Sequence, residues 1–255
     1  MSLLNKFSLR EHIALVTGAS SGIGRAVAIA FSEAGAKVLL LARRKSMLVE
    51  LREEINERGG EAAVIVCDLS RVDNWDKLAE RAAQDFGPPD ILVNNAGVNL
   101  RESWQEISDA SWDVTMDLNL KTPFFLTRAL IPHMAKRRWG KILNIASLQS
   151  ERAFPNSIPY GASKGGVAQL TRAMSEAWSG QGIMVNAIAP GFFPTELTQP
   201  VFEKKERLEE LARQTTIGRN GRLDDLVGAA VFLCSPAADY ITGQTLYVDG
   251  GFTAK

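Results

Sequence analysis

Residues 13–24 read IALVTGASSGIG, and this stretch decides the fold. Its first four residues form an apolar run of strand length, and three glycines follow between positions 18 and 24. From Ile23 to Ala34, apolar side chains recur three and four residues apart, which is the spacing of one helix face. Gly35 then ends the helical pattern. The sequence therefore predicts a strand, a tight glycine-rich turn and a helix, in that order.

The same alternation continues along the chain. Further apolar runs of strand length occur at residues 38–41, 62–66, 91–93, 142–145, 184–188 and 245–248. Helical patterns cover residues 47–58, 75–86, 112–134, 160–179, 203–213 and 224–233. Pro123 predicts a bend or an adjustment inside the longest of these helices. Strands that are apolar throughout are buried on both faces, which is typical of a parallel sheet between helices. We therefore predict the α/β class, with residues 1–255 forming one Rossmann-like, doubly wound domain around a seven-stranded parallel sheet with helices on both faces.

The composition excludes several classes of protein. Lys and Arg number 29, as do Asp and Glu, so the formal net charge is zero, which argues against general nucleic-acid binding. No apolar run approaches the roughly 20 residues that span a bilayer, and residues 1–10 lack the apolar stretch of a signal peptide. Cys67 and Cys234 form neither a disulfide framework nor a metal-binding spacing. We expect a cytoplasmic protein that binds a small molecule, without a metal, a membrane or a nucleic acid.

The glycine loop predicts a phosphate site. The free N–H groups and the positive end of a helix attract an anion, and this loop would lie at that end. Gly18 allows a turn at positive φ, Gly22 has no Cβ to block a phosphate, and Gly24 lets the helix pack closely on the strand. A flexible loop without a ligand is the alternative. The predicted contacts are Gly18, Ser20, Ser21, Gly22, Ile23 and Gly24.

The residues after the second strand indicate which nicotinamide cofactor would bind. Folds of this type place an acid about 20 residues past the glycines to bind the ribose 2′-hydroxyl of NAD. Here the segment reads Leu41-Ala42-Arg43-Arg44-Lys45, and no acid appears before Glu50. Arginine pairs with phosphate, and three cations at a helix start oppose its dipole unless an anion compensates them. We predict that NADP(H) is preferred over NAD(H), with Arg43 as the main determinant and Arg44 beside it. A solvated basic cluster is the alternative.

Other strand ends carry weaker cofactor signals. Asp68, followed by Leu69, would accept a hydrogen bond from an adenine amino group, or else cap a turn. The small residues and amides after the fourth strand would allow close approach and tie neighbouring strands together. The segment after the sixth strand would provide a rigid wall and a hydroxyl. These candidates, each with a turn-forming alternative, are Asn95, Ala96, Gly97, Pro190, Gly191, Phe193 and Thr195.

The fifth strand leads to the predicted chemistry. Ser147 ends it, Tyr160 opens the next helix, and Lys164 lies four residues later on the same helix face. A phenol has a pKa of about 10, and a nearby positive charge lowers that pKa. We predict that Tyr160 gives or takes the hydroxyl proton while Ser147 orients the substrate oxygen. A Tyr and a Lys at this spacing also occur on many helices without function.

Further polar residues have open alternatives. Asn119 lies in an apolar helical stretch, where a buried amide needs partners. It would hold a water that links Lys164 to solvent, or else bond to another helix. Arg101 and Gln149, beyond strand ends, join Ser147 and Tyr160 as candidate substrate contacts. Ordinary exposed polar residues would give the same pattern.

Together these motifs resemble the short-chain dehydrogenase/reductase family along nearly the whole chain. The matching elements are T-G-x-x-x-G-x-G at residues 17–24, N-N-A-G at 94–97, Asn119, Ser147, Y-x-x-x-K at 160–164, Pro190-Gly191 with Thr195, and V-D-G-G at 248–251. The resemblance implies that Asn119, Ser147, Tyr160 and Lys164 form a catalytic tetrad. It also implies NAD(P)-dependent carbonyl–alcohol interconversion by hydride transfer without a metal, and a homotetramer.

Within that family, residues 147–151 and 188–198 look most like those of gluconate 5-dehydrogenases and related sugar-acid or polyol dehydrogenases. The resemblance implies a secondary alcohol or ketone of that class as substrate. Phe192, Phe193 and Phe202, in the stretch that would cover the site, favour larger apolar ketones instead. The alternatives are therefore a 3-oxoacyl thioester reductase or general ketone reductase and, in another class, a non-catalytic regulator that senses NADP(H).

Overall fold

The computed structural model describes residues 2–255. Within them, seven parallel strands form one sheet in the order β3-β2-β1-β4-β5-β6-β7. The strands are β1 (Ile13–Thr17), β2 (Lys37–Ala42), β3 (Glu61–Val66), β4 (Ile91–Asn94), β5 (Gly140–Ile145), β6 (Ile183–Pro190) and β7 (Thr245–Val248). The order reverses between β1 and β4, and a crevice for ligands opens at such a point, beyond the carboxyl ends of the strands.

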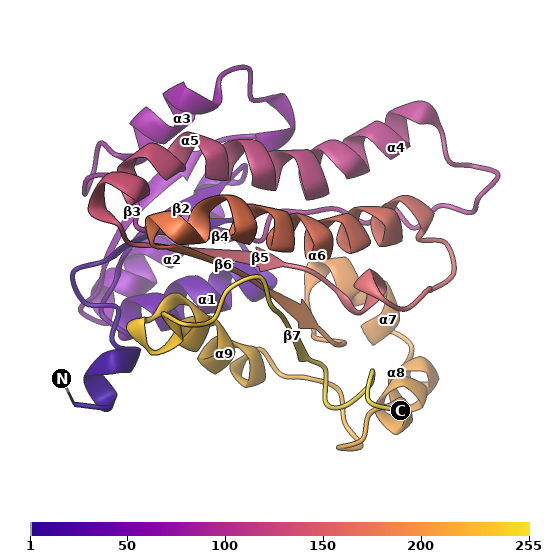
Figure 1. Cartoon of the computed structure of the whole chain (residues 1–255). Coiled ribbons are helices and arrows are strands. Elements are labelled where there is room, and N and C mark those ends of the chain that lie inside the picture. The colour runs from indigo at the N-terminus through magenta and orange to yellow at the C-terminus, as the bar shows by residue number, and fades with distance from the viewer. Residues whose placement is uncertain (1) are drawn as a thin grey trace.

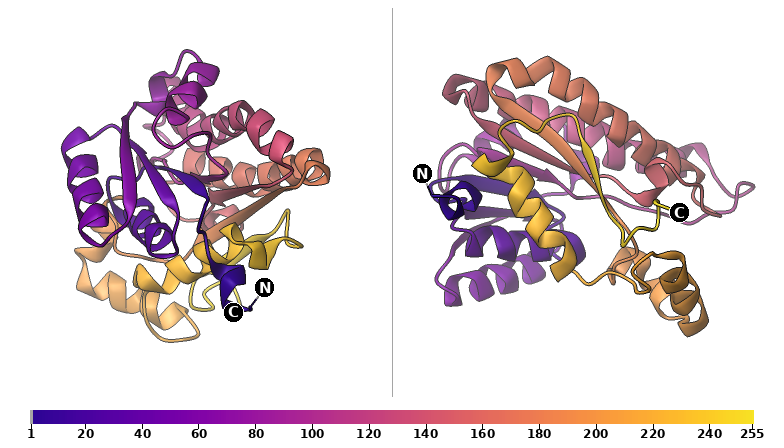
Figure 2. Two further views of the ribbon diagram at one scale, coloured as in Figure 1. Left: turned by 90° about the vertical axis from the view of Figure 1, so that its left-hand side faces the viewer. Right: turned by 60° about the horizontal axis from the view of Figure 1, so that its bottom comes forward.

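Helices cover both faces of the sheet (Figures 1 and 2). One face carries α1 (Gly22–Glu33), α2 (Lys45–Glu57) and α9 (Asp224–Cys234). The other carries α3 (Trp75–Ala82), α5 (Thr122–Arg137) and α6 (Ile158–Trp178), and α4 (Asp109–Met116) leads into α5. Two shorter helices, α7 (Gln199–Phe202) and α8 (Lys205–Gln214), follow β6. The predicted doubly wound α/β class with a seven-stranded parallel sheet is confirmed.

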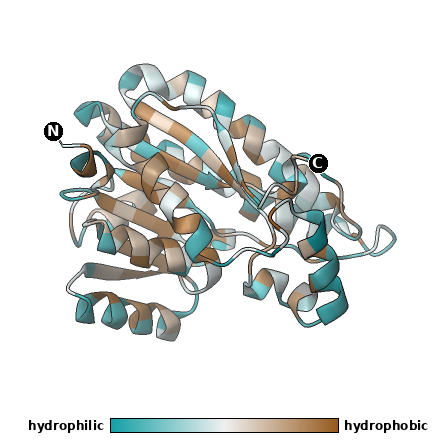
Figure 3. Ribbon diagram, turned by 90° about the horizontal axis from the view of Figure 1, so that it is seen from below, coloured by the Kyte–Doolittle hydropathy of each residue, from teal (hydrophilic) through white to brown (hydrophobic). Residues whose placement is uncertain are grey.

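The core has one layer of apolar side chains on each face of the sheet. All five residues of β1 and all six of β5 are buried, so these strands contribute side chains to both layers. Phe31 of α1 and Leu51 of α2 pack in one layer, whereas Leu126 of α5 and Met174 of α6 pack in the other. Figure 3 shows the resulting hydrophobic strands between helices whose outer surfaces are largely hydrophilic. This arrangement explains why the central strands are mostly apolar.

The predicted adjustment near Pro123 is confirmed. The helical region divides into α4, a five-residue π-helical turn from Asp117 to Lys121, and α5. Pro123 directly follows this turn as the second residue of α5, and because proline has no N–H, one hydrogen bond of the continuous helical region is not made there. The π-helical turn contains Asn119. Helix α7 was not predicted, because four residues are too few to show a helical period.

A buried carboxylate ties the amino-terminal ends of the strands together. Asp90, which is 4% exposed, accepts a hydrogen bond from the backbone N–H of Ile13 (3.2 Å) and pairs with Arg137 of α5. His12 Nδ1 lies 3.6 Å from the same carboxylate. Burial by itself raises the pKa of Asp90, but contacts with His12, Ile13 and Arg137 outweigh it and hold that pKa below its usual value.

Replacing Asp90 by Asn should lower the unfolding free energy by about 1–3 kcal/mol at pH 7, because a charge-assisted contact is lost. The folded-state pKa of Asp90 is lowered, so its stabilising effect is present above an unfolded value of about 4 and disappears as pH falls through the folded value. Urea unfolding of both proteins at pH 7 and pH 3 measures the difference. The difference in unfolding free energy between the wild type and Asp90→Asn should be smaller at pH 3 than at pH 7. An equal difference at both pH values would contradict this role of Asp90.

Candidate active site

The glycine loop between β1 and α1 forms one wall of a cavity of about 1100 Å³ at the carboxyl ends of the strands. Gly18 has φ of +64°, a left-handed conformation that disfavours other residues. A Cβ on Gly24 would lie 2.4 Å from the Gly18 carbonyl oxygen and 2.5 Å from Asn95 Nδ2, so only glycine fits there. Helix α1 begins at Gly22, and its N-terminus therefore lies at the cavity.

Asn95 fastens the glycine loop to the end of β4. Its Nδ2 donates to the backbone oxygens of Thr17 (3.0 Å) and Gly18 (3.2 Å). The Thr17 hydroxyl donates to the Val93 carbonyl (3.0 Å) and accepts from the backbone N–H of Asn95 (2.9 Å). These contacts join the neighbouring ends of β1 and β4, as the amide-rich segment predicts, and they hold the loop in a defined shape.

Two arginines follow β2. Arg43 lines the cavity with a side chain that is 73% exposed, and its Nη1 lies 4.0 Å from Asp68 Oδ2. Arg44 instead lies on the glycine loop, where Nη2 donates to Ser20 Oγ (3.0 Å) and Ser21 Oγ (2.9 Å). The Glu196 carboxylate accepts two further hydrogen bonds from Arg44. This contact between distant segments was not predicted from the sequence.

Asp68 caps a turn, which was one of the two roles that the sequence allowed for it. Its carboxylate accepts from the Ser70 backbone N–H (3.1 Å) and the Ser70 hydroxyl (2.7 Å) at the start of a short 3₁₀ turn. Burial raises the pKa of Asp68, but the Ser70 hydrogen bonds and the charges of Arg43 and Arg71 bring it below the usual value. Asp68 and Leu69 also line the cavity, so a cap and a cofactor contact are compatible.

Ser147, Tyr160 and Lys164 meet at the floor of the same cavity. Ser147 follows β5, and its Oγ accepts from the Gln149 backbone N–H (3.1 Å). Tyr160 lies in the first turn of α6, and Lys164 follows one turn later. The Lys164 ammonium donates to the Ile145 carbonyl (2.6 Å) and lies 5.6 Å from the centre of the Tyr160 ring. The strand end and the helix thus bring the three side chains together.

The pKa of Tyr160 differs from the prediction. Burial raises it above 10, and the hydrogen bond with Ser147 and the charge of Arg101 lower it only in part. Burial also lowers the pKa of Lys164 to about 8. The sequence predicted a lowered phenol pKa from the Tyr–Lys spacing alone. That prediction was wrong for this structure because burial outweighs the Ser147 hydrogen bond and the charge of Arg101, and residue spacing alone cannot show burial.

Asn119 has protein partners for its whole side-chain amide. Its Oδ1 accepts from the Val98 backbone N–H (2.8 Å), and its Nδ2 donates to the Val98 carbonyl (2.9 Å) and to Ser163 Oγ (3.1 Å). Of the two roles considered from the sequence, the structure shows the second: the Asn119 amide bonds across to another helix, α6. It holds the segment after β4 against α6, beside the cavity rather than in its lining.

Arg101, in the segment that follows β4, also lines the cavity. Its φ is +56°, and its Nη2 donates to the Leu197 carbonyl (3.1 Å). Its Nε is buried and has no hydrogen-bond partner among residues 2–255. Its positive charge is near enough to lower the pKa of Tyr160. A buried donor without a partner is costly, which makes this nitrogen a candidate for binding an anionic or carbonyl oxygen.

All but two of the predicted site residues line the cavity; the exceptions are Gly24, which packs beneath the loop, and Asn119. Of the three aromatic residues expected to cover the site, Phe192 and Phe193 line it and Phe202 does not. The cavity lining also includes unpredicted polar residues, which are Asn99, Asn156, Glu196, Thr198, Lys204 and Arg207. No recognisable motif marks them. Most come from loops or a short 3₁₀ turn, and Arg207 comes from α8.

Among residues 2–255, no cluster of three or more His, Cys, Asp or Glu side chains is arranged to hold a metal ion. No helix in this part of the chain is both long enough and apolar enough to cross a membrane.

Comparison with known proteins gives a consistent result. The family model for enoyl-(acyl carrier protein) reductase matches residues 18–253. Gluconate 5-dehydrogenase of Gluconobacter oxydans is 41% identical over 255 residues, 100% of both chains. The 2-dehydro-3-deoxy-D-gluconate 5-dehydrogenase of Escherichia coli is 39% identical over 99% of this chain and 100% of its own. A crystal structure of a Burkholderia cenocepacia gluconate 5-dehydrogenase with NADP and tartrate has a TM-score of 0.95 and 37% identity, with 100% of both chains covered.

Proposed function

Because this chain belongs to the short-chain dehydrogenase/reductase family, we propose that it is an NADP(H)-dependent oxidoreductase of sugar acids or polyols. It would interconvert a secondary alcohol and a ketone, as in gluconate and 5-ketogluconate. The observation that carries the proposal is the convergence of Ser147, Tyr160 and Lys164 with Arg101 in the lining of one cavity. Relatives whose names specify gluconate-type substrates support the substrate class.

The residues present fit a nicotinamide dinucleotide. The cavity reaches from the glycine loop to Tyr160, and its volume suits a ligand of that size. The N-terminus of α1 would bind the pyrophosphate, and Arg43 with Arg44 would bind a 2′-phosphate. When bound, the cofactor supplies or accepts the hydride. The related structure with NADP supports this choice of cofactor for the present chain.

In this proposal Tyr160 transfers the proton between its phenol oxygen and the substrate oxygen, and Ser147 orients the same substrate oxygen. A raised phenol pKa keeps Tyr160 protonated, as proton donation to a ketone requires. The Lys164 ammonium would favour phenolate in the opposite direction, when the alcohol is oxidised. Asn119 would act by positioning, since it holds Val98 and Ser163 beside the catalytic helix.

Arg101 is the proposed carboxylate contact. Its planar guanidinium offers donors in the forked geometry that a carboxylate accepts. Arg101 lines the cavity, and the only hydrogen bond that its guanidinium makes to the rest of residues 2–255 is the one from Nη2 to Leu197, so further guanidinium donors would be available to a substrate carboxylate. Gln149, on the turn after β5, would bind a hydroxyl of the same substrate. These two contacts would favour a polyhydroxylated acid over a simple ketone.

One observation favours an apolar ketone or a 3-oxoacyl thioester instead. Phe154, Phe192 and Phe252 form an aromatic cluster with ring centroids 5.7–6.1 Å apart. Phe154 and Phe192 line the cavity, where they would contact an apolar chain. The enoyl-(acyl carrier protein) reductase description of the matching family model is compatible with this alternative.

A homotetramer is part of the same proposal. Exposed apolar side chains occur on α4 and at the start of α6, with Trp112 38%, Val114 46% and Ile158 55% exposed. Such side chains favour contact with a second copy of the chain. Within one copy, the seven strands share one sheet, which supports a single domain.

A coupled screen tests the substrate class. We expect the purified protein to oxidise gluconate or reduce 5-ketogluconate with NADP(H), because the cavity combines a carboxylate-binding group with the catalytic residues. The assay measures nicotinamide absorbance with sugar acids, polyols and 3-oxoacyl thioesters, each with both cofactors. Turnover of thioesters alone would overturn the sugar-acid assignment and favour the aromatic wall as the substrate contact.

A further inference from the structure

Arg44 joins three segments that are far apart in the sequence. It is the residue immediately before α2, and its guanidinium reaches the glycine loop through Ser20 and Ser21. Its other contacts are to Glu196, with Nη1 2.8 Å from Oε1 and Nη2 2.9 Å from Oε2. The carboxylate and the guanidinium therefore meet as two parallel hydrogen bonds, the geometry that gives such pairs their specificity.

Glu196 opens a segment that runs beside the substrate end of the cavity. Thr195 caps this 3₁₀ turn by accepting from the Thr198 backbone N–H (3.3 Å). The next residue, Leu197, accepts from Arg101, the proposed substrate contact. The segment then continues through α7 and α8. The Arg44–Glu196 pair thus connects the glycine loop to the residues that position Arg101.

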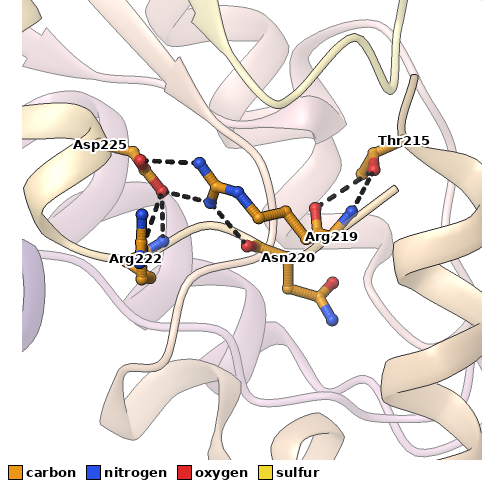
Figure 4. A network of polar contacts seen from close by, with 5 residues as sticks. All are labelled: Thr215, Arg219, Asn220, Arg222 and Asp225. Carbon is orange, nitrogen blue, oxygen red and sulfur yellow. Dashed lines mark hydrogen bonds and ion pairs between the residues drawn. The ribbon is translucent and has the colours of Figure 1, made fainter. Parts of the chain in front are cut away.

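The far end of this segment has its own anchor, shown in Figure 4. Arg219 donates from both terminal nitrogens to the Asp225 carboxylate (2.6 and 2.9 Å). Thr215 Oγ1 accepts from the Arg219 backbone N–H (3.1 Å), and Asp225 accepts from that of Arg222 (2.8 Å). These contacts link the end of α8 to the start of α9. Leu211 of α8 is fully buried against Leu148 and Phe252, so α8 is held as well. Residues 196–204 therefore lie between this anchored helix and the Arg44 contact.

A phosphate and the Glu196 carboxylate are alternative partners for Arg44. Both are anions that accept two parallel hydrogen bonds from a guanidinium. Hydrogen bonds from Arg44 lower the pKa of Glu196, so the carboxylate is charged at neutral pH. Ser20, Ser21 and Arg44 all line the cavity next to the N-terminus of α1, where a phosphate is expected. Two anions at one guanidinium repel each other, which favours exchange over joint binding.

We propose that Glu196 competes with a cofactor phosphate for Arg44, so that cofactor binding releases residues 196–204 from the glycine loop. This inference rests on the proposed function, because it assumes that a nicotinamide dinucleotide binds. The exchange couples the cofactor site to the segment that holds Arg101. Glu196 lowers cofactor affinity and retains the segment until the phosphate arrives. The coupling is reciprocal, as all binding linkage must be.

Direct binding tests the competition. Glu196→Gln should bind NADPH about 3–10-fold more tightly than the wild type, the size expected for a forked but half-exposed ion pair. Glu203→Gln is the matched control, since it makes the same change of charge in the same segment, and Glu203 contacts Gln199 and not Arg44. Fluorescence titrations with NADPH and with NADH give the dissociation constants.

The two cofactors identify the phosphate. If Glu196→Gln binds only NADPH more tightly, the phosphate that competes with Glu196 is the 2′-phosphate. If it binds NADH more tightly by the same factor, the competing phosphate belongs to the pyrophosphate. Both results support the exchange. The proposed exchange is overturned if Glu196→Gln leaves the cofactor affinity unchanged, or if Glu203→Gln raises that affinity by the same factor. If the wild type binds neither cofactor, the proposed function fails instead.

Hydrogen exchange tests the release of the segment. Adenosine 2′,5′-bisphosphate carries the phosphates without the nicotinamide, so it would reach Arg44 without contacts around Thr195. It should accelerate amide exchange in residues 196–204 of the wild type, whereas α8, which is held by the buried Leu211, should change little. In Glu196→Gln, the amides of this segment should exchange rapidly even without ligand, and adding adenosine 2′,5′-bisphosphate should change their exchange rates little. Unchanged wild-type exchange at a saturating ligand concentration would overturn the proposed release.

Discussion

Replacing Tyr160 by Phe should reduce kcat by a factor of about 10²–10⁴, the range for removal of a general acid–base group. The substitution removes the phenol oxygen, which is the partner of Ser147 and the proposed proton carrier. The ring, which is 8% exposed and lies 5.6 Å from the Lys164 ammonium, keeps its packing. The loss should therefore appear in turnover rather than in folding. Steady-state kinetics with saturating cofactor and substrate measure it.

The control for this substitution is Tyr240→Phe, which removes a phenol oxygen from a fully exposed side chain. It should retain wild-type kcat. Thermal unfolding and NADPH titration should show that Tyr160→Phe remains folded and binds cofactor. Retained turnover in that folded protein would refute the assigned role of Tyr160. If the wild type binds NADPH but converts none of the tested substrates, the result would favour the alternative of a non-catalytic regulator that senses NADP(H).

Reversing the charge of Arg43 should have the next largest effect. Arg43→Glu should lower kcat/KM with NADPH by about 10²–10³, because a charge-assisted contact is lost and a like charge replaces it. The change with NADH should be small, since NADH has no 2′-phosphate. Arg43 suits this role because its side chain is 73% exposed at the cavity and lies 4.0 Å from Asp68 without a closer ion pair. The ratio of kcat/KM for the two cofactors measures the effect.

Lys45→Glu is the matched control, because Lys45 belongs to the same basic run but is not part of the cavity lining. It should change the cofactor ratio far less than Arg43→Glu. If both substitutions lower the ratio equally, the basic run acts as a diffuse field and Arg43 has no specific role. If the wild type prefers NADH, the prediction of NADP(H) from the sequence is wrong.

The sequence was sufficient for the fold because the information is local. Continuous apolar runs such as those of β1 and β5 indicate strands covered on both faces, and the structure buries every residue of both. Gly18 and Pro123 act through their own backbones, so a left-handed turn and an adjusted helix could be predicted at those points. Strand ends locate the cavity, because parallel strands place their carboxyl ends at one edge.

The sequence by itself thus determined the sheet, the glycine loop and much of the cavity lining, but not residues such as Asn99, Glu196 and Arg207. Only the tertiary structure decided how those residues interact. The Arg44–Glu196 pair joins positions 152 residues apart, and the buried Nε of Arg101 depends on neighbours from several segments. The raised pKa of Tyr160 likewise follows from burial by the whole fold. Periodicity and motifs indicate the local backbone structure around a residue. Ion pairing, desolvation and the pKa depend on distances that exist only after distant segments pack together.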